Sequence, residues 1–380
     1  MKELGIYIHI PFCKRKCYYC DFVSFSNKGQ LVEKYVKALN SEIIEKSKEI
    51  NKEYEVTTIY IGGGTPSFID EENIEKILNN VFTNYDVTKN AEITIEINPG
   101  TVNEGKIEKY KQIGINRISI GLQSTNNELL DKIGRIHKFV DFINTYNIVK
   151  KVGFDNINVD LMLALPNQTI QDLEESLNKV IELNPKHISV YSLIVEEETP
   201  IQKMLEKNKI SLPSEDIERN MYWMVKETLE KNNYNHYEIS NFAQKGYESK
   251  HNMNCWEQKE YLGFGVAAHS YINNNRISNI EIIEEYIRNI EEGKIEKNQI
   301  IEEEQTDEEK QKEYMLLGLR KIEGVNIQEF KNKFVENPIY IFHKELERLV
   351  NEELIEIDLN QIKLTSKGLD FANLVWEEFI

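Results

Sequence analysis

The chain has 380 residues, of which 40% are hydrophobic and 29% charged, as in globular proteins long enough to bury more than one core. The formal net charge is −18, and this excess of acid argues against nucleic acid as a partner, because phosphate binding needs a basic surface. No apolar run approaches the roughly 18 residues of a membrane span, and the first residues lead into a predicted strand without room for a signal peptide. We therefore expect a cytoplasmic protein with no membrane span.

Short β-rich apolar runs alternate with longer amphipathic stretches over the first 200 residues. The runs predict strands at 5–10, 57–61, 92–97, 117–120, 156–161 and 187–193, and the stretches predict helices at 31–49, 71–82, 104–113, 139–151 and 170–183. Repeated strand-then-helix units predict an α/β fold with a parallel sheet and right-handed crossovers, and six units indicate a barrel or partial barrel. In such folds the chemistry gathers at the carboxyl ends of the strands.

The pattern changes near Thr306. Helices are predicted at 308–321, 327–334 and 340–351, followed by strands at 354–357 and 361–364 and a closing helix through 379. This order resembles a small winged-helix-like α+β domain. We expect a barrel over 1–235, a connecting segment over 236–305 and this C-terminal domain over 306–380. DNA binding is the usual role of such a shape, but the surplus of acid favours a lid over the barrel or a docking surface.

Three of the four cysteines lie within eight residues, as Cys13, Cys17 and Cys20. Disulfides need pairs, so three closely spaced thiols favour a soft metal or an iron–sulfur cluster. A four-iron cluster takes four ligands, and three thiolates leave one iron open for an exchangeable ligand. A zinc site on the same thiolates, with or without His9, is the alternative. We expect the basic residues at 14–16 to lower the thiol pKa values.

Other polar groups follow the predicted strands. A glycine-rich turn, Gly62-Gly-Gly-Thr-Pro66, follows the second strand and would bring backbone amides close to a ligand. The third, fourth and fifth strands carry Glu96, Gln123 and Asp160 near their ends, where a carboxylate could accept hydrogen bonds from a ribose. Arg135 would supply a cation for a carboxylate, while the neighbouring His137 is expected to be exposed.

Taken in order, the motifs YIHIPFC, GGGTP, EINPGT, SIGLQS, GRIH and VDLMLALP resemble the HemN/HemW group of the radical S-adenosylmethionine (SAM) superfamily, over nearly the whole chain. The resemblance implies a [4Fe-4S] cluster on Cys13, Cys17 and Cys20, with SAM chelating the fourth iron and an electron donor for cluster reduction. The residues that it implies for SAM contact are Tyr7, Tyr19, Gly63, Gly64, Thr65, Glu96, Gln123, Arg135 and Asp160.

The group divides into two functions. One branch is the oxygen-independent coproporphyrinogen III oxidase of porphyrin biosynthesis, and the other is a haem chaperone that delivers haem to acceptor proteins. The oxidase typically carries a further cysteine where this chain has Phe22, and it has an N-terminal arm where Cys13 here follows almost directly from the start. Both features favour the chaperone branch.

The segment His251-Asn-Met-Asn-Cys-Trp256 resembles the H-N-x-x-Y-W motif that the chaperone branch associates with haem. Histidine is a common haem ligand, and Trp256 offers an aromatic face to a porphyrin. Cys255 stands where that branch carries tyrosine; it is either a thiolate ligand or a small buried side chain. His269 is a second candidate ligand, with a satisfied core histidine as its alternative.

The sequence thus predicts a haem chaperone that binds haem and a SAM-chelated cluster and passes haem to acceptor proteins. Two alternatives stay open at this point: a radical SAM coproporphyrinogen oxidase, and a zinc-containing regulatory protein built on the same three thiols.

Overall fold

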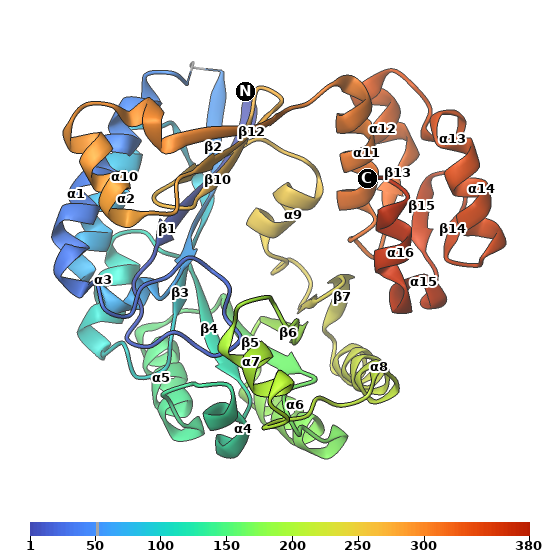
Figure 1. Cartoon of the computed structure of the whole chain (residues 1–380), viewed down its shortest axis with the longest axis horizontal. Coiled ribbons are helices and arrows are strands. Elements are labelled where there is room, and N and C mark those ends of the chain that lie inside the picture. The colour runs from blue at the N-terminus through green and yellow to red at the C-terminus, as the bar shows by residue number, and fades with distance from the viewer. Residues whose placement is uncertain (51–52) are drawn as a thin grey trace.

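The computed structural model describes residues 1–50 and 53–380, and its main feature is an open twelve-stranded sheet (Figure 1). The six predicted parallel strands are confirmed, and they pair in chain order at the centre of the sheet. They are β1 (Lys2–Ile10), β2 (Tyr54–Gly63), β3 (Val87–Ile97), β4 (Arg117–Gln123), β5 (Ile157–Leu163) and β6 (His187–Ser192).

The five predicted helices are also present, and they cover the outer side of these strands (Figure 1). They are α1 (Val32–Ser47), α2 (Glu71–Asn84), α3 (Glu104–Gln112), α5 (Phe139–Val152) and α6 (Ile170–Leu183). Local sequence explains their starts: the Asn103 side chain accepts from the Lys106 amide, and Thr169 forms a capping box with Asp172. Their apolar sides join the strands in one large core.

Several helices and turns were not predicted from the sequence. After β4 lie α4 (Asn127–Lys132), α7 (Pro200–Glu206) and α8 (Glu215–Lys231). Before β4, the short 3-10 turns η1 (Gly29–Leu31) and η2 (Pro66–Phe68) follow β1 and β2. Two of the helices are six and seven residues long, too short to show an apolar period.

The segment expected to connect the two domains extends both ends of the sheet. Beyond β1 it adds β9 (Tyr261–Phe264), β10 (His269–Ile272), β11 (Asn275–Asn279) and β12 (Gln299–Glu304), and beyond β6 it adds β8 (Asn241–Ala243) and β7 (Asn235–Glu238). It also contains α9 (Lys250–Trp256), α10 (Ile283–Glu291) and η3 (Ile295–Asn298). Because β12 and β7 end the strand order without pairing to each other, the predicted partial barrel is confirmed as an open sheet.

The C-terminal part has its own hydrophobic core, centred on Met315, Phe330 and Val375. The predicted elements occur in the predicted order, but β13 was not predicted, and the helix expected at 340–351 and the closing helix are each divided in two. The elements are α11 (Asp307–Gly318), β13 (Val325–Asn326), α12 (Ile327–Phe334), α13 (Pro338–Ile341), α14 (His343–Asn351), β14 (Ile355–Ile357), β15 (Gln361–Leu364), α15 (Ser366–Asp370) and α16 (Ala372–Glu377). Figure 1 shows this domain beside the sheet, with α9 between the two. No helix in the described ranges is both long and apolar enough to cross a membrane.

Candidate ligand cavity at the carboxyl ends of the strands

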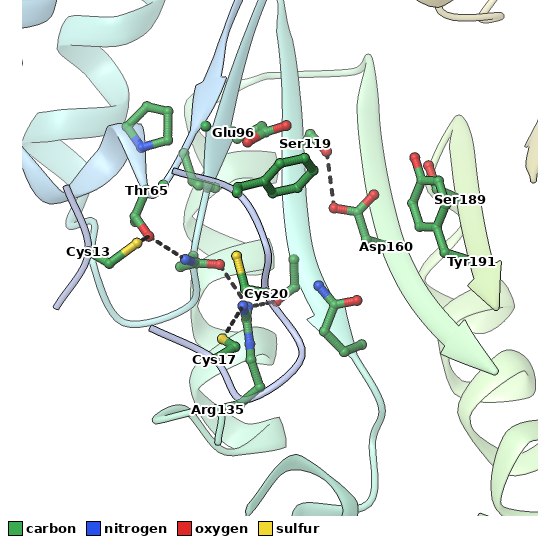
Figure 2. A pocket seen from close by; sticks show the side chains of 18 of the residues that line it. Cys13, Cys17, Cys20, Thr65, Glu96, Ser119, Arg135, Asp160, Ser189 and Tyr191 are labelled. Carbon is green, nitrogen blue, oxygen red and sulfur yellow. Dashed lines mark hydrogen bonds between the residues drawn. The ribbon is translucent and has the colours of Figure 1, made fainter. Parts of the chain in front are cut away.

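A cavity of about 370 Å³ opens at the carboxyl ends of the parallel strands. It lies where the sheet topology predicts ligand binding, and most of the predicted cofactor residues line it. Those lining it are Cys13, Cys17, Cys20, Tyr19, Gly63, Gly64, Thr65, Glu96, Gln123, Arg135 and Asp160. Figure 2 shows the three thiols on one side of this space and Tyr191 and Ser189 on the other, with Asp160 between them.

The cysteine loop follows β1 and is fixed at both of its ends. Cys13 N donates to Phe25 O, and Phe25 N donates in return to Pro11 O, so the loop closes on itself. Arg15 extends across to α4 and the segment after it, where its guanidinium donates to Gly134 O and Arg135 O at 2.7 to 3.0 Å. Because backbone bonds set the course of the loop, the thiols can face the cavity as free groups.

The pKa values of Cys13 and Cys20 differ from the sequence expectation. Burial raises the pKa of Cys13, and burial together with the neighbouring Cys17 raises that of Cys20 to about 11, although Lys16 opposes the second shift. For Cys13 and Cys20 the expected net lowering of the pKa was wrong, because desolvation outweighs the charge of Lys16, which does act in the expected direction on Cys20. Among the described residues, no three His, Cys, Asp or Glu side chains are grouped to hold a single metal ion.

The glycine-rich turn after β2 lies directly against the cysteine loop. Gly63 has a φ of +111°, and a Cβ there would lie 2.6 Å from the His9 ring. A Cβ on Gly64 would lie 3.0 Å from Cys13 Sγ. Thr65 Oγ1 donates to Cys13 Sγ at 3.5 Å and accepts from Asn98 Nδ2 at 2.8 Å. Glycine is therefore required here so that the turn can approach the thiol.

Arg135 connects the cysteine loop to the strand ends. Its Nη1 points at Cys17 Sγ at 3.7 Å, and its Nη2 donates to Asn98 Oδ1 at 2.7 Å and to Gly121 O. Its Nε is buried without a hydrogen-bond partner, as is Gln123 Oε1. Gln123 also has a φ of +71°, which turns the chain at the end of β4. Two buried polar atoms without partners indicate room for a polar ligand.

Two carboxylates lie deeper in the cavity. Tyr60 OH donates to Glu96 Oε1 at 2.8 Å, and burial raises the Glu96 pKa to about 7. Asp160 accepts from Asn158 Nδ2 at 2.7 Å, and burial raises its pKa as well. Hydroxyl or ammonium donors from a ligand would therefore stabilise the charged form of both carboxylates.

Tyr7, which was expected to contact SAM, does not line this cavity. Its OH lies 2.9 Å from His9 Nδ1, and the His9 Nε2 lies 2.9 Å from Val23 O. Burial lowers the His9 pKa to about 4, so the ring is neutral near pH 7. Because a carbonyl can only accept, Nε2 carries the hydrogen and Nδ1 accepts from Tyr7. His9 thus ties the end of the cysteine loop to β1.

The predicted haem residues also lie outside the cavity lining. His251 is buried, with Nδ1 2.9 Å from Thr58 Oγ1 and its ring stacked on Tyr60. The Trp256 ring is covered by the Arg320 guanidinium, which lies 4.4 Å from its centroid. Burial raises the Cys255 pKa to about 11, which favours the neutral thiol.

Two histidines differ from their expected exposure. His269, for which a core position was the alternative, is exposed on β10. His137, expected at the surface, is 3% exposed, and its Nε2 lies 3.1 Å from Leu122 O. The GRIH segment packs under the strand ends with Arg135, which explains why this histidine is buried.

Sequence reasoning missed several residues that line the cavity, namely Phe22, Asn98, Arg117, Asn158, Ser189, Tyr191 and Asn252. A signal existed for some of them. On β4, Ile118, Ile120 and Leu122 alternate with Arg117, Ser119, Gly121 and Gln123, and this period of two separates the face toward the helices from the face toward the cavity. Asn252 lies next to His251 in the predicted haem motif, and it is the residue of that motif that reaches the cavity.

Comparison with known proteins places these features in a family. Residues 7–180 match the radical SAM superfamily and residues 305–371 match the HemN C-terminal domain. The structure is similar to that of HemN, the coproporphyrinogen III oxidase of Escherichia coli, with a TM-score of 0.85 and 23% identity, covering 100% of this chain and 90% of that one. At that identity the similarity shows the fold.

Proteins named heme chaperone HemW are similar along the whole chain. The Lactococcus lactis protein is 38% identical over 100% of this chain and 98% of its own length, and the Bacillus subtilis protein is 37% identical over 98% of each. The Escherichia coli protein is 36% identical over 72% of this chain and 71% of its own length. The chain therefore belongs to the HemW family of radical SAM proteins.

Proposed function

We propose that this protein is a haem chaperone that binds haem beside a SAM-chelated [4Fe-4S] cluster and transfers the haem to acceptor proteins. The observation that carries the proposal is the similarity, along the whole chain, to proteins named heme chaperone HemW. An electron donor for the cluster and one or more haem acceptors are the partners that this function requires.

The residues present fit the cluster. Cys13, Cys17 and Cys20 are free thiols that line one cavity, and Gly64 leaves space beside Cys13 Sγ. The fourth cysteine, Cys255, is on α9 and does not line this cavity. Three thiolates would therefore hold the cluster and leave one iron for an exchangeable ligand. Arg135, with Nη1 3.7 Å from Cys17 Sγ, would offset the charge of the thiolates.

The residues around the thiols also fit SAM. The cluster and SAM, when bound, would supply one-electron chemistry. Glu96 and Asp160 would accept hydrogen bonds from the ribose hydroxyls or the ammonium group, and the two partnerless atoms, Gln123 Oε1 and Arg135 Nε, would gain partners. The Gly63 turn would bring its backbone close to the ligand without a clashing side chain. Tyr19 lines the same space.

Phe22 supports the chaperone over the oxidase. It stands where the oxidase typically has a further cysteine, lines the cavity, and is 64% exposed. An exposed aromatic ring at a cavity mouth offers apolar contact to a flat ligand such as a porphyrin. In this proposal His251, Cys255 and His269 are the candidate haem ligands, and Trp256 is a candidate aromatic contact for the porphyrin.

The test is anaerobic reconstitution with iron and sulfide, followed by haem titration while the Soret band is recorded. We expect a stoichiometric haem complex. Loss of propionate carboxyl groups from coproporphyrinogen III, in the presence of SAM and a reductant and without haem binding, would instead assign the oxidase function. A colourless protein that contains zinc and takes up no iron would assign the zinc alternative.

A further inference from the structure

Arg117 is a buried cation that no predicted role explains. It is the first residue of β4, its side chain is 2% exposed, and it lines the cavity. Gly121 lies four residues after Arg117 on the same strand, and its carbonyl oxygen accepts a hydrogen bond from Arg135 near the thiols. Four residues of strand span about 13 Å. Arg117 and Arg135 therefore start from opposite ends of the cavity wall, and only Arg135 is close to a cysteine.

The Arg117 guanidinium has no partner in the part of the chain that the structure describes. Its Nε is buried without a hydrogen bond, and no ion pair or side-chain hydrogen bond joins the group to residues 1–50 or 53–380. Leaving a buried charge unpaired costs several kcal/mol. A guanidinium with five donors that faces a cavity therefore indicates a site for an anionic ligand group.

Three buried carboxylates lie close enough for the Arg117 charge to affect their pKa values, but each accepts its hydrogen bonds from other residues. The Arg117 charge opposes the burial-driven rise in the pKa values of Glu92, Glu96 and Asp160. Glu92 Oε1 accepts from His251 N at 3.3 Å, Glu96 accepts from Tyr60 OH, and Asp160 accepts from Asn158 and Ser119. The carboxylates therefore attract Arg117 only at a distance, and none of them pairs with its donors.

The chemistry of the site favours a carboxylate as the missing partner. The planar guanidinium pairs with a carboxylate through two parallel hydrogen bonds. A phosphate dianion would meet stronger repulsion from the three carboxylates nearby. The same cavity has apolar groups, with Phe22 64% exposed, Tyr191 40% exposed and Met162 buried. A ligand that fits both features has a carboxylate edge and an apolar body.

We propose that Arg117 binds a propionate carboxylate of haem at the inner end of the cavity, with the macrocycle edge toward Phe22 and Tyr191. This inference rests on the proposed haem chaperone function and assigns a ligand-binding residue to it. SAM also carries a carboxylate, and the experiment below separates the two sources.

The test compares haem with haem dimethyl ester, in which both propionates are blocked, on the reconstituted full-length protein. Wild type should bind haem about 10- to 100-fold more tightly than the ester, the range of a charge-assisted hydrogen bond. Arg117→Met should lose this preference, and Arg117→Lys should keep part of it. Arg288→Met is the matched control, because Arg288 is a surface residue of α10 and its loss changes the net charge equally.

The outcomes separate the inference from the function on which it rests. Wild type that binds neither ligand overturns both. Haem binding without preference over the ester, or a preference that Arg117→Met retains, overturns the inference alone. Equal weakening of both ligands would make Arg117 only a counter-ion of the three carboxylates and would overturn the inference.

A second measurement separates haem from SAM as the source of the carboxylate. Binding of SAM and of decarboxylated SAM, measured by equilibrium dialysis, should respond equally to Arg117→Met. A selective loss of SAM binding would assign the carboxylate to SAM and overturn the haem assignment. The Lys variant keeps the test valid if the Met variant does not fold.

Discussion

The cysteine loop and the α9 segment are both short motifs, but they present their residues in different ways. In the loop, all three cysteines line the cavity. In α9, His251 packs behind Tyr60, Trp256 lies against Arg320, and only Asn252 of the motif lines the cavity. A loop held by its backbone can turn every side chain to one side, whereas a helix of seven residues distributes its side chains around its axis.

The α9 segment contacts the wall of the cavity through His251. His251 stacks on Tyr60 with ring centroids 5.2 Å apart, and Tyr60 donates to Glu96 inside the cavity. On its other side α9 is attached to the C-terminal domain, because the Arg320 guanidinium also lies 4.7 Å from the centroid of the Trp376 ring. The α9 segment thus supports the cavity wall, while the cysteine loop forms part of it.

The largest expected effect is loss of the cluster. Replacing Cys13, Cys17 or Cys20 by alanine should reduce bound iron after reconstitution at least about 10-fold, because each thiolate supplies one cluster ligand. Cys255→Ala is the matched control and should retain iron, since this thiol is outside the cavity. Iron content and visible absorption measure the outcome. Equal loss of iron in Cys255→Ala would show that α9 reaches the cluster.

The glycine turn should be the position most sensitive to small changes. Gly63→Ala combines a positive φ with a Cβ 2.6 Å from the His9 ring, and we expect about 3 kcal/mol of destabilisation. Gly100→Ala shares the positive φ but meets nothing within 4 Å, so about 1 kcal/mol is expected. Urea unfolding of the two variants measures the difference, and equal losses would contradict the close packing of the turn on His9.

Substitutions at two neighbouring residues of α9, His251 and Asn252, should distinguish an effect on stability from an effect on ligand binding. His251→Ala removes a buried ring and leaves Thr58 Oγ1 without its partner, which should cost about 2 kcal/mol or more. Asn252→Ala alters a partly exposed side chain and should change stability by less than about 0.5 kcal/mol. Chemical denaturation and haem titration of both variants provide the measurements. If His251→Ala removes haem binding at unchanged stability, the histidine is a ligand and α9 must rearrange.

A further expected effect is a pH dependence from Glu96. Its pKa is raised in the folded protein to about 7, so the folded state holds a proton that the unfolded state releases near pH 4.5. The stability that this proton provides is complete below about pH 4.5 and is lost as the pH rises through 7. The unfolding free energy of wild type should therefore fall relative to Glu96→Gln by at most about 1.4 kcal/mol per pH unit in this window. Parallel pH profiles for the two proteins would contradict the raised pKa.

Much of the fold follows from local sequence. The six central strands and their five helices were predicted because apolar runs of period two and amphipathic stretches alternate regularly, with caps such as Thr169 at helix starts. The strands that extend the sheet were missed. Several, such as β8 and β9, have three or four residues and gain their stability from pairing with a strand already in place.

The candidate site was predicted in part for a similar reason. Cysteines, glycines and carboxylates at strand ends carry their chemistry in the sequence, so the residues near the thiols could be named. Arg117 and Asn252 could not, because an arginine at the start of a strand or an asparagine in a helix acquires a role only when the fold turns it toward a cavity. The alternation of apolar and polar residues on β4 shows that the strand has two faces, but it does not show that one face lines a cavity.

The sequence by itself determined the parallel strand–helix core and the spacing of the three thiols, because both depend on residues close together along the chain. The tertiary structure alone decided that His251 is buried behind Tyr60, that the Trp256 ring lies under Arg320, and that the Arg117 guanidinium faces the cavity without a partner. These last features arise from contacts between distant segments, where burial and pairing depend on which surfaces the sheet brings together.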